Sequence, residues 1–322
     1  MVRQAHPERI ATHQSSIVLP FALSLSKGER EGERQILRLL VRELKQMATL
    51  FLFFLSIFFI LPLPSDCSSQ NVPWERVDEG LSLGRLDPPL KPVPNDSKIV
   101  VVRINPKFYA FKLLCASEYG RIRLTAKDWC LKHNLTSAIN AGMYQKDGLT
   151  NVGYMRNFNH FNNRSMNSTY KAVLAFNNRD PGVPEIQIID LTCQGFEELK
   201  PKYQTFVQNI RMISCNGENV WARQDRVSSL AVLGMDKSGN ALFVFSEAPY
   251  SGHDFNNVLL SLPISLYNAM YLEGGAEASL YLVAGGIELD RSGTYGTGFT
   301  ESPVRPEARL IPNVIGIEKK KK

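Results

Sequence analysis

The chain has 322 residues, 44% of them hydrophobic and 21% charged, and this ordinary globular composition excludes disordered, collagen-like and coiled-coil proteins. Its formal net charge is +6, but residues 1–46 hold eight basic and five acidic side chains and residues 319–322 are four lysines, so the remaining chain carries a net charge of −1. Because the fold itself has no excess of basic side chains, the sequence predicts no nucleic-acid partner.

The N-terminal part combines an apolar stretch with basic residues ahead of it. Residues 50–61 read LFLFFLSIFFIL, which is twelve residues without a charge, whereas a membrane-spanning helix needs about 20. With Arg42 and Lys45 before it, this stretch is typical of a secretory signal peptide, which we place at residues 47–67. The sequence therefore predicts a secreted or periplasmic protein. The alternative is an uncleaved signal that anchors the chain in a membrane through residues 50–61.

The rest of the chain divides by composition. Residues 1–46 show no apolar periodicity, and we interpret them as an unstructured extension or as the product of a start site assigned too early. Residues 68–97 are expected to form an opening segment and a proline-rich linker, residues 98–318 a single domain, and residues 319–322 a lysine tail.

Within the domain, strand-like runs are more numerous than helical ones. The runs are rich in β-branched and aromatic residues and are bounded by turn signals such as DKSGN at residues 236–240. Short helices are expected at residues 125–134, which begin with a Thr-x-x-Asp cap, and at residues 253–262. Because strands and helices do not alternate, the pattern predicts an α+β fold with mixed or antiparallel sheets and a few short helices. The expected strands are residues 98–104, 108–114, 170–176, 185–191, 206–213, 229–235, 241–246, 269–273, 278–283 and 312–318.

One long stretch lacks both patterns. Residues 145–169 carry six asparagines and almost no apolar period. Loops of this length are uncommon unless they bind something or cover a site, so we expect this loop to lie at the functional site.

Four of the five cysteines lie in the domain, at positions 115, 130, 193 and 215. None has the C-x-x-C spacing of a zinc or redox site, and export permits disulfides. Four cysteines allow three connectivities. Proximity in the sequence favours the pairs Cys115–Cys130 and Cys193–Cys215.

The segment with the strongest chemical signal is YLEGGAEASLYL at residues 271–282. A strand ends on Glu273, and Gly274 and Gly275 then turn the chain. Such a turn lets backbone N–H groups converge on an anion or a carboxylate, and Glu277 would face the same turn. The alternative is a tight turn with two surface glutamates.

This segment resembles the signature of the phosphodiester glycosidase family. Other blocks agree in order, namely AINAGMY (138–144), the strand at 208–212, RVSSLAVLGMDKSG (226–239) and IPNVIGIE (311–318), while PYSGHDF (249–255) resembles the form of a bacterial subgroup. The resemblance covers residues 75–318 and implies hydrolysis of a sugar linked through its anomeric carbon to a phosphodiester. It implies a substrate-binding set made of Asn140, Gly142, Gln208, Arg211, Ser228, Gly274, Gly275, Glu277 and Ser279.

The residue types that this chemistry needs are present. An arginine fork binds the phosphodiester anion, and Arg226 or Arg211 is expected to supply it. Glu273 is expected to stabilise the oxocarbenium-like transition state, and His253 or Glu277 to act as the base. For His253, the alternative is a helix N-terminal residue that bonds backbone or solvent.

Three departures from the family pattern leave a second function open, and the first is Asn140-Ala141-Gly142 in place of the Asn-Gly-Gly of other members. Many relatives have Asp-Gly-Gly where this chain has Glu273-Gly274-Gly275, and Arg211 stands where proline is common. The sequence therefore predicts an exported hydrolase acting on an envelope or extracellular glycan, with a non-catalytic glycan-binding protein on the same fold as the alternative. No metal-ligand cluster, P-loop or dinucleotide fingerprint is present, so no cofactor is predicted, although a single Ca²⁺ held by carboxylate and carbonyl oxygens stays open.

Overall fold

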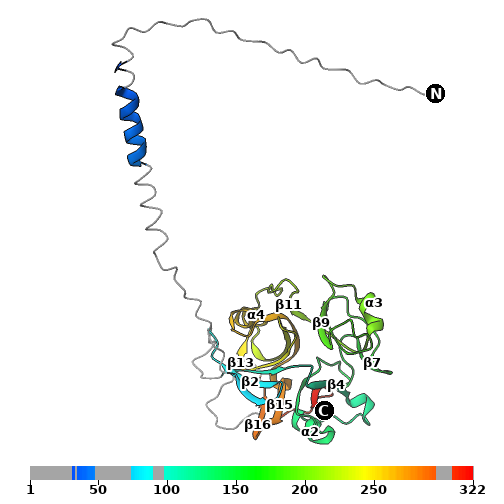
Figure 1. Cartoon of the computed structure of the whole chain (residues 1–322). Helices are drawn as coiled ribbons and strands as arrows, with labels where there is room; N and C mark the ends of the chain where they lie inside the picture. The colour runs from blue at the N-terminus through cyan, green and yellow to red at the C-terminus, as the bar shows by residue number, and fades with distance from the viewer. Residues whose placement is uncertain (1–30, 33–34, 48–73, 90–97, 295–306, 322) are drawn as a thin grey trace, which may run out of the picture. The chain divides into compact units, whose positions relative to one another are not determined.

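The computed structural model describes residues 31–32, 35–47, 74–89, 98–294 and 307–321 (Figure 1). The chain divides into two compact units, Met1–Ser68 and Ser69–Lys322. In the first unit, residues 35–47 form a helix with exposed side chains, so the extension predicted for residues 1–46 is helical at this end rather than unstructured. No helix among the described residues is long and apolar enough to cross a membrane. The predicted signal core at residues 50–61 lies outside the described residues.

The described residues of the second unit form three antiparallel sheets. The largest has the strand order β1-β2-β3-β13-β12-β14-β11, and Figure 1 shows its yellow and gold strands curling beside helix α4 (Gly252–Ser261). The opening segment predicted at residues 68–97 supplies two of its strands. The DKSGN turn joins β12 to β13 as a hairpin. The strand bounds are β1 Glu75–Asp78, β2 Leu81–Leu86, β3 Ile99–Ile104, β11 Arg211–Ile213, β12 Ser228–Asp236, β13 Ala241–Tyr250 and β14 Leu266–Gly274.

The two smaller sheets have the orders β7-β6-β10-β8-β9 and β16-β15-β5-β17-β4. The first includes two short strands from the stretch predicted as a continuous loop at residues 145–169, so that prediction is corrected for seven of its residues. The bounds are β4 Tyr109–Cys115, β5 Ser137–Asn140, β6 Met155–Asn157, β7 His160–Asn163, β8 Ala172–Asn178, β9 Ile186–Asp190, β10 Tyr203–Asn209, β15 Ser279–Ala284, β16 Ile287–Ser292 and β17 Asn313–Lys319.

The described helices of the second unit are short, and side chains cap the two longest of them. Thr125 caps α2 (Ala126–His133) by accepting the Asp128 N–H, as the Thr-x-x-Asp pattern predicts. Ser251 caps α4 in the same way through the Asp254 N–H. The remaining helical turns are α3 (Phe196–Leu199), η1 (Ala116–Glu118), η2 (Lys200–Lys202) and η3 (Gly275–Glu277). The predicted α+β fold with antiparallel sheets and short helices is confirmed.

The core shows why only one of the two predicted disulfides forms. Alternate residues of β4 face opposite sides of their sheet, so Cys115 lies in the main core while Leu114 packs in the cluster that contains Cys130 of α2. The two thiols are therefore separated by the sheet, and both cysteines are free and buried. The prediction of a Cys115–Cys130 bond is wrong, whereas the Cys193–Cys215 disulfide is present.

Candidate active site

Glu273 stands at the end of β14, next to an irregularity in the sheet. In the pairing of β12 with β14, Ala231 lies opposite Glu273 but Val232 lies opposite Tyr271, so Leu272 is an extra residue. Such bulges redirect side chains and are frequent beside active sites. Here the side chains of Tyr271 and Glu273 line the same cleft.

This cleft has a volume of about 320 Å³. Its walls combine aromatic and polar groups: Trp221, Tyr250 and Tyr271 supply the aromatic surface, and Arg226, Ser228 and Glu273 supply polar groups. The volume lies at the lower end of the range of roughly 300–1,000 Å³ that is usual for small-molecule sites. The cleft therefore brings together four of the residues that the sequence assigned to the site, namely Arg226, Ser228, Glu273 and Gly274.

The carboxyl group of Glu273 is buried and electrostatically unusual. The residue is 9% exposed, and its burial raises the pKa of the carboxyl to about 8, with a smaller contribution in the same direction from the charge of Glu277. The Gly274 N–H donates a hydrogen bond of 3.0 Å to Oε1 and acts in the opposite direction. Glu273 is thus protonated at neutral pH, whereas the sequence suggested an ionised carboxylate at this position.

The glycine turn after Glu273 leaves no room for larger residues. A Cβ on Gly274 would lie 2.4 Å from the Tyr271 hydroxyl and 3.0 Å from Ser228 Oγ. Gly275 has a φ of +70°, a left-handed conformation that favours glycine. The two glycines therefore hold the Glu273 backbone close to both β12 and the cleft wall.

Asn140 and Ser279 hold the backbone of this turn through hydrogen bonds. The Ser279 N–H donates 2.7 Å to Asn140 Oδ1, while Asn140 Nδ2 donates 2.8 Å to the carbonyl oxygen of Glu277. The Ser279 hydroxyl donates to the same carbonyl at 3.1 Å. Because both side chains are buried and committed to the turn, they position Glu273 and Glu277 rather than line the cleft.

Gly142 and Gln208 hold the chain around the site. A Cβ on Gly142 would lie 2.7 Å from Asn151 Oδ1 and 2.8 Å from Asn209 Nδ2, so the loop after β5 packs closely on β10. The buried side-chain amide of Gln208 accepts the N–H groups of Tyr154 and Asn167 and donates to two backbone carbonyls. Gln208 therefore ties the polar loop to β10, which leaves it no hydrogen-bonding capacity for a substrate.

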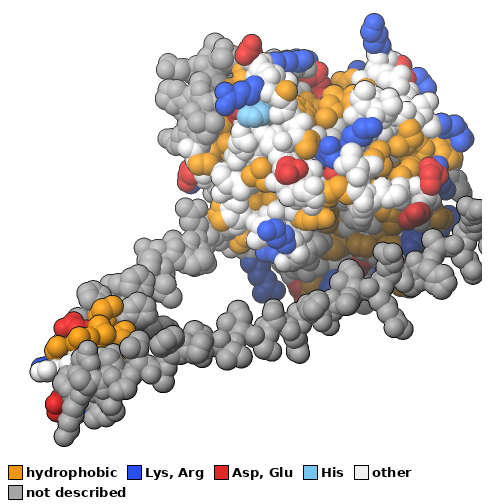
Figure 2. All heavy atoms as spheres, turned by 90° about the horizontal axis from the view of Figure 1, so that it is seen from above, with side chains coloured by type: hydrophobic (Ala, Val, Ile, Leu, Met, Phe, Trp, Pro, Cys, Tyr) orange, Lys and Arg blue, Asp and Glu red, His pale blue; other side chains and the backbone are white. Residues whose placement is uncertain are grey.

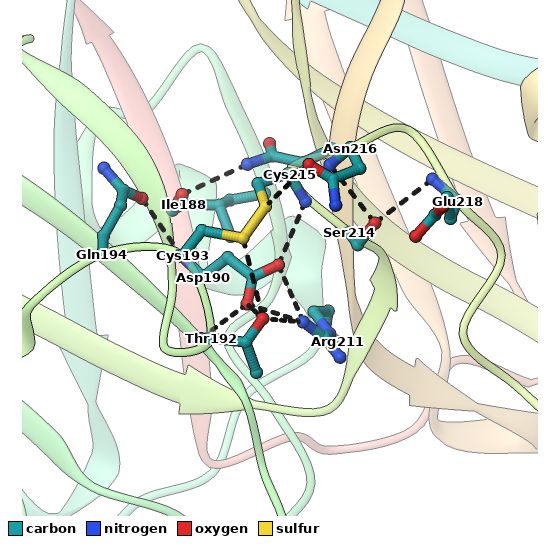
Figure 3. Close-up of a disulfide and its surroundings, with 11 residues drawn as sticks. Ile188, Asp190, Thr192, Cys193, Gln194, Arg211, Ser214, Cys215, Asn216 and Glu218 are labelled. Carbon is teal, nitrogen blue, oxygen red and sulfur yellow. Dashed lines mark hydrogen bonds and ion pairs between the residues drawn. A yellow bond between two sulfur atoms is a disulfide. The ribbon is translucent and has the colours of Figure 1, made fainter. Parts of the chain in front are cut away.

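Arg211 lies beside the disulfide rather than in the cleft, as Figure 3 shows. Its Nη1 is 2.7 and 2.9 Å from the two carboxylate oxygens of Asp190, which also accepts the Cys215 N–H at 3.0 Å. Asp190 is 1% exposed, so this ion pair compensates a buried charge. Of the two arginines proposed for the phosphodiester, Arg211 has a structural partner, and Arg226 is exposed on the cleft without an ion pair to any residue that the structure describes.

The two candidate bases occupy different places. His253 has Nδ1 3.2 Å from Asp254 Oδ1 at the start of α4, and it does not line the cleft although its neighbour Gly252 does. Glu277 lies on η3, close enough to Glu273 for its charge to raise the pKa of that carboxyl. Neither residue lines the cleft, so what distinguishes Glu277 from His253 is its electrostatic proximity to Glu273.

Several site residues were not assigned by the sequence. Burial raises the pKa of the hydroxyls of Tyr144 and Tyr170; the charges of Glu277 and Glu273 add to the shift at Tyr144, and that of Glu273 adds to the shift at Tyr170. Tyr144 falls within the AINAGMY block, which was a usable signal. Trp221 and Tyr271 line the cleft, and Trp221 Nε1 donates to the carbonyl oxygen of Arg211 at 2.7 Å. Nothing in the residues around Trp221 distinguished it from other surface aromatics.

Potential metal ligands are grouped at one place among the described residues. Asp190, Cys193 and Cys215 lie together there, but the two sulfur atoms are joined in the disulfide and Asp190 pairs with Arg211. This group is therefore a structural cluster. The Ca²⁺ site that the sequence left open is not assigned to this cluster.

Comparison with known proteins shows the family of the chain. The model of the phosphodiester glycosidase family matches residues 133–318, more than half of the chain. The protein belongs to this family, and the family supports a glycosidase-type function. No curated protein matches the chain.

Two solved structures share the fold at low sequence identity. A hypothetical protein from Synechocystis aligns with a TM-score of 0.53 and 15% identity, over 75% of this chain and 62% of that one. The catalytic domain of zebrafish N-acetylglucosamine-1-phosphodiester alpha-N-acetylglucosaminidase, auto-inhibited by its pro-peptide, aligns with a TM-score of 0.51 and 13% identity, over 71% of this chain and 81% of that domain. The chain thus spans less than two thirds of the Synechocystis protein.

Proposed function

We propose that the protein hydrolyses a glycosyl-1-phosphodiester in an envelope or extracellular glycan. The observation that carries this proposal is the buried carboxyl of Glu273, which opens into a polar cleft that has Arg226 on its wall. Families of this chemistry act on a bond between an anomeric carbon and a phosphate oxygen. A carboxyl and a cation on one cleft match the two ends of that bond.

The protonation state of Glu273 defines its part in the reaction. With a pKa of about 8, the carboxyl carries its proton at neutral pH and acts as the general acid. The bond from the anomeric carbon to the phosphate oxygen breaks, and the Glu273 proton passes to that oxygen. Water attacks the anomeric carbon and gives its proton to Glu277, so the products are a free sugar and a phosphomonoester.

Arg226 has the chemistry to hold the phosphodiester. The guanidinium presents paired N–H donors that fit two phosphate oxygens, and its positive charge balances the single negative charge of the diester. On the face of the molecule in Figure 2, Lys and Arg side chains are interspersed with Asp and Glu. Among the described residues that line the cleft, Arg226 is the one basic side chain, so the substrate anion is held there by this arginine.

A second candidate function is glycan binding without turnover. It is favoured by Arg211, which the sequence offered to the phosphodiester but which pairs with Asp190 beside the disulfide. A cleft with one cation fewer binds a sugar through its aromatic wall and leaves the ester intact.

We further propose that the protein is exported. The Cys193–Cys215 disulfide supports this proposal, since such bonds persist in oxidising compartments. The apolar stretch at residues 50–61 also supports it. Anchoring by that stretch is the alternative to release.

The experiment compares the wild type with Glu273→Gln on a panel of sugar-1-phosphodiesters, with release of the reducing sugar followed by NMR. We expect Glu273→Gln to lower turnover by about 100-fold or more while the ligand still binds, as is typical of a lost general acid. His253→Gln is the control, because this residue lies outside the cleft, and it is expected to keep its turnover. Unchanged turnover in Glu273→Gln removes this residue from the mechanism, and saturable binding without turnover in the wild type supports the binding protein.

A further inference from the structure

A second cavity lies apart from the Glu273 cleft. It has a volume of about 290 Å³ and shares no lining residue with the cleft. Phe111 and Phe176 of β4 and β8 form its floor, with ring centroids 6.2 Å apart in an edge-to-face contact. The turn between β6 and β7 and the C-terminal Lys320 form its rim.

Phe158 places an aromatic ring at this rim, although its backbone conformation is unfavourable for a bulky residue and its side chain is exposed. It is 44% exposed and has a φ of +50°, in a two-residue turn whose flanking residues Asn157 and His160 pair with each other. Glycine is the favoured residue where such a turn needs a positive φ, and a bulky side chain there is an outlier. The backbone is held by a hydrogen bond from the Phe158 N–H to the Gln204 carbonyl oxygen, 3.0 Å. A ring kept at a glycine position, next to a cavity and largely exposed, indicates a role in contact rather than in folding.

The polar groups around the cavity are uncharged or already paired. Asn177 Nδ2 donates to Thr205, and Asn178 Nδ2 donates to the Asp180 carbonyl oxygen. The side-chain carbonyl oxygens of these two asparagines accept no hydrogen bond from the residues that the structure describes. The side-chain amide of Gln204 makes no hydrogen bond within the same set. Glu185 and Lys320 form an ion pair with each other. The cavity therefore offers a row of neutral amide groups.

We propose that this cavity is an accessory binding site for an uncharged saccharide unit. A sugar ring has an apolar C–H face that packs on an aromatic ring, and hydroxyls at its edge that exchange hydrogen bonds with amides. The Phe158 ring supplies the aromatic surface on which the C–H face of the sugar packs. The carbonyl oxygens of Asn177 and Asn178 accept hydroxyl protons, and Gln204 Nε2 donates to a hydroxyl oxygen.

The position along β10 separates this site from the cleft. Gln204 lies near one end of the strand, and Asn209, whose Nδ2 donates to the Leu272 carbonyl oxygen beside Glu273, lies at the other. Five residues of strand correspond to about 17 Å. The inference thus shares with the proposed function only the glycan class of ligand, and it does not need turnover at Glu273.

The test uses saturation-transfer NMR on the full chain with two neutral trisaccharides, maltotriose and triacetylchitotriose. Phe158→Gly removes the ring and places the favoured residue in the turn, so the thermal midpoint is expected to stay equal or rise. Tyr267→Ala is the matched control, because Tyr267 is an aromatic side chain of similar exposure, 45%, on β14 and outside the cavity. Glu273→Gln tests whether the sugar sits in the cleft instead.

We expect transfer to the ring protons of at least one trisaccharide in the wild type, Tyr267→Ala and Glu273→Gln, with a loss of tenfold or more in Phe158→Gly. Gln204→Ala is expected to weaken the same signal. Transfer that persists in Phe158→Gly, or that disappears in Glu273→Gln, overturns the inference. The absence of transfer from both sugars at millimolar concentration also overturns it, whatever the outcome of the turnover assay.

Discussion

The burial of Glu273 makes the stability of the protein depend on pH in a way that one substitution removes. The folded state holds the Glu273 proton with a pKa of about 8, compared with the ordinary value of 4.5 that applies to the unfolded chain. Below pH 4.5 the Glu273 carboxyl is protonated in both the folded and the unfolded state, so it does not lower the free energy of unfolding. As the pH rises toward 8, the unfolded chain releases the proton while the folded protein keeps it, so stability falls until the folded carboxyl also ionises.

The size of this effect follows from the two pKa values. Each pH unit between them corresponds to about 1.4 kcal/mol, so the full effect on the free energy of unfolding is about 5 kcal/mol above pH 8 and about 3 kcal/mol at pH 7. Glu273→Gln keeps the shape of the side chain without a titrating group. We therefore expect this variant to equal the wild type at pH 4 and to become more stable than it by several kcal/mol at pH 9.

Urea unfolding at pH 4, 5, 7 and 9 measures the difference directly. Glu197→Gln serves as the control, because the Glu197 side chain is 81% exposed on α3. A stability difference between Glu273→Gln and the wild type that stays constant over this pH range would refute the reasoning, since Glu273 would then be ionised in the folded protein and unable to act as an acid.

Three further predictions concern residues around the site. Arg226→Ala is expected to raise KM for a phosphodiester substrate by tenfold or more with unchanged thermal stability. Arg211→Ala leaves the buried Asp190 unpaired and is expected to lower the free energy of unfolding, measured by calorimetry, by about 3 kcal/mol. A KM effect in the Arg211 variant alone contradicts this assignment. Replacing Cys193 and Cys215 together by serine removes a link across 22 residues and is expected to cost about 3 kcal/mol in urea unfolding, and an unchanged midpoint argues against the bond. Gln208→Ala leaves the buried Tyr154 N–H and the partly buried Asn167 N–H without their acceptor, at roughly 1–3 kcal/mol for the buried group. The variant is expected to speed hydrogen exchange in the loop at residues 145–169, a change that a substrate-contacting role does not produce.

Much of the fold could be read from local patterns. Runs of β-branched and aromatic residues indicated strands because these residues fit a half-buried pleated surface, and the cap at Thr125 indicated a helix because it satisfies a free N–H. The block around Glu273-Gly274-Gly275 indicated the family because the turn tolerates few other residues, as the approach of Tyr271 to Gly274 shows.

What the sequence did not indicate depends on contacts between distant segments. Arg211 and Asp190 are 21 residues apart, at the start of β11 and the end of β9, and the tertiary fold brings them together. Cys115 and Cys130 are close in sequence, yet the alternation of β4 places Cys115 on the face of the sheet opposite to the one on which α2 and Cys130 pack. The protonation of Glu273 likewise depends on burial, which no local pattern reports.

The measurement that tests the central claim most directly is phosphorus NMR of a sugar-1-phosphodiester mixed with the purified protein. The account predicts that the diester signal converts to a monoester signal at the rate at which free sugar appears, and that Glu273→Gln slows both by about 100-fold. A diester signal that persists while the wild-type protein binds the sugar saturably would contradict the hydrolase assignment and establish the glycan-binding function instead.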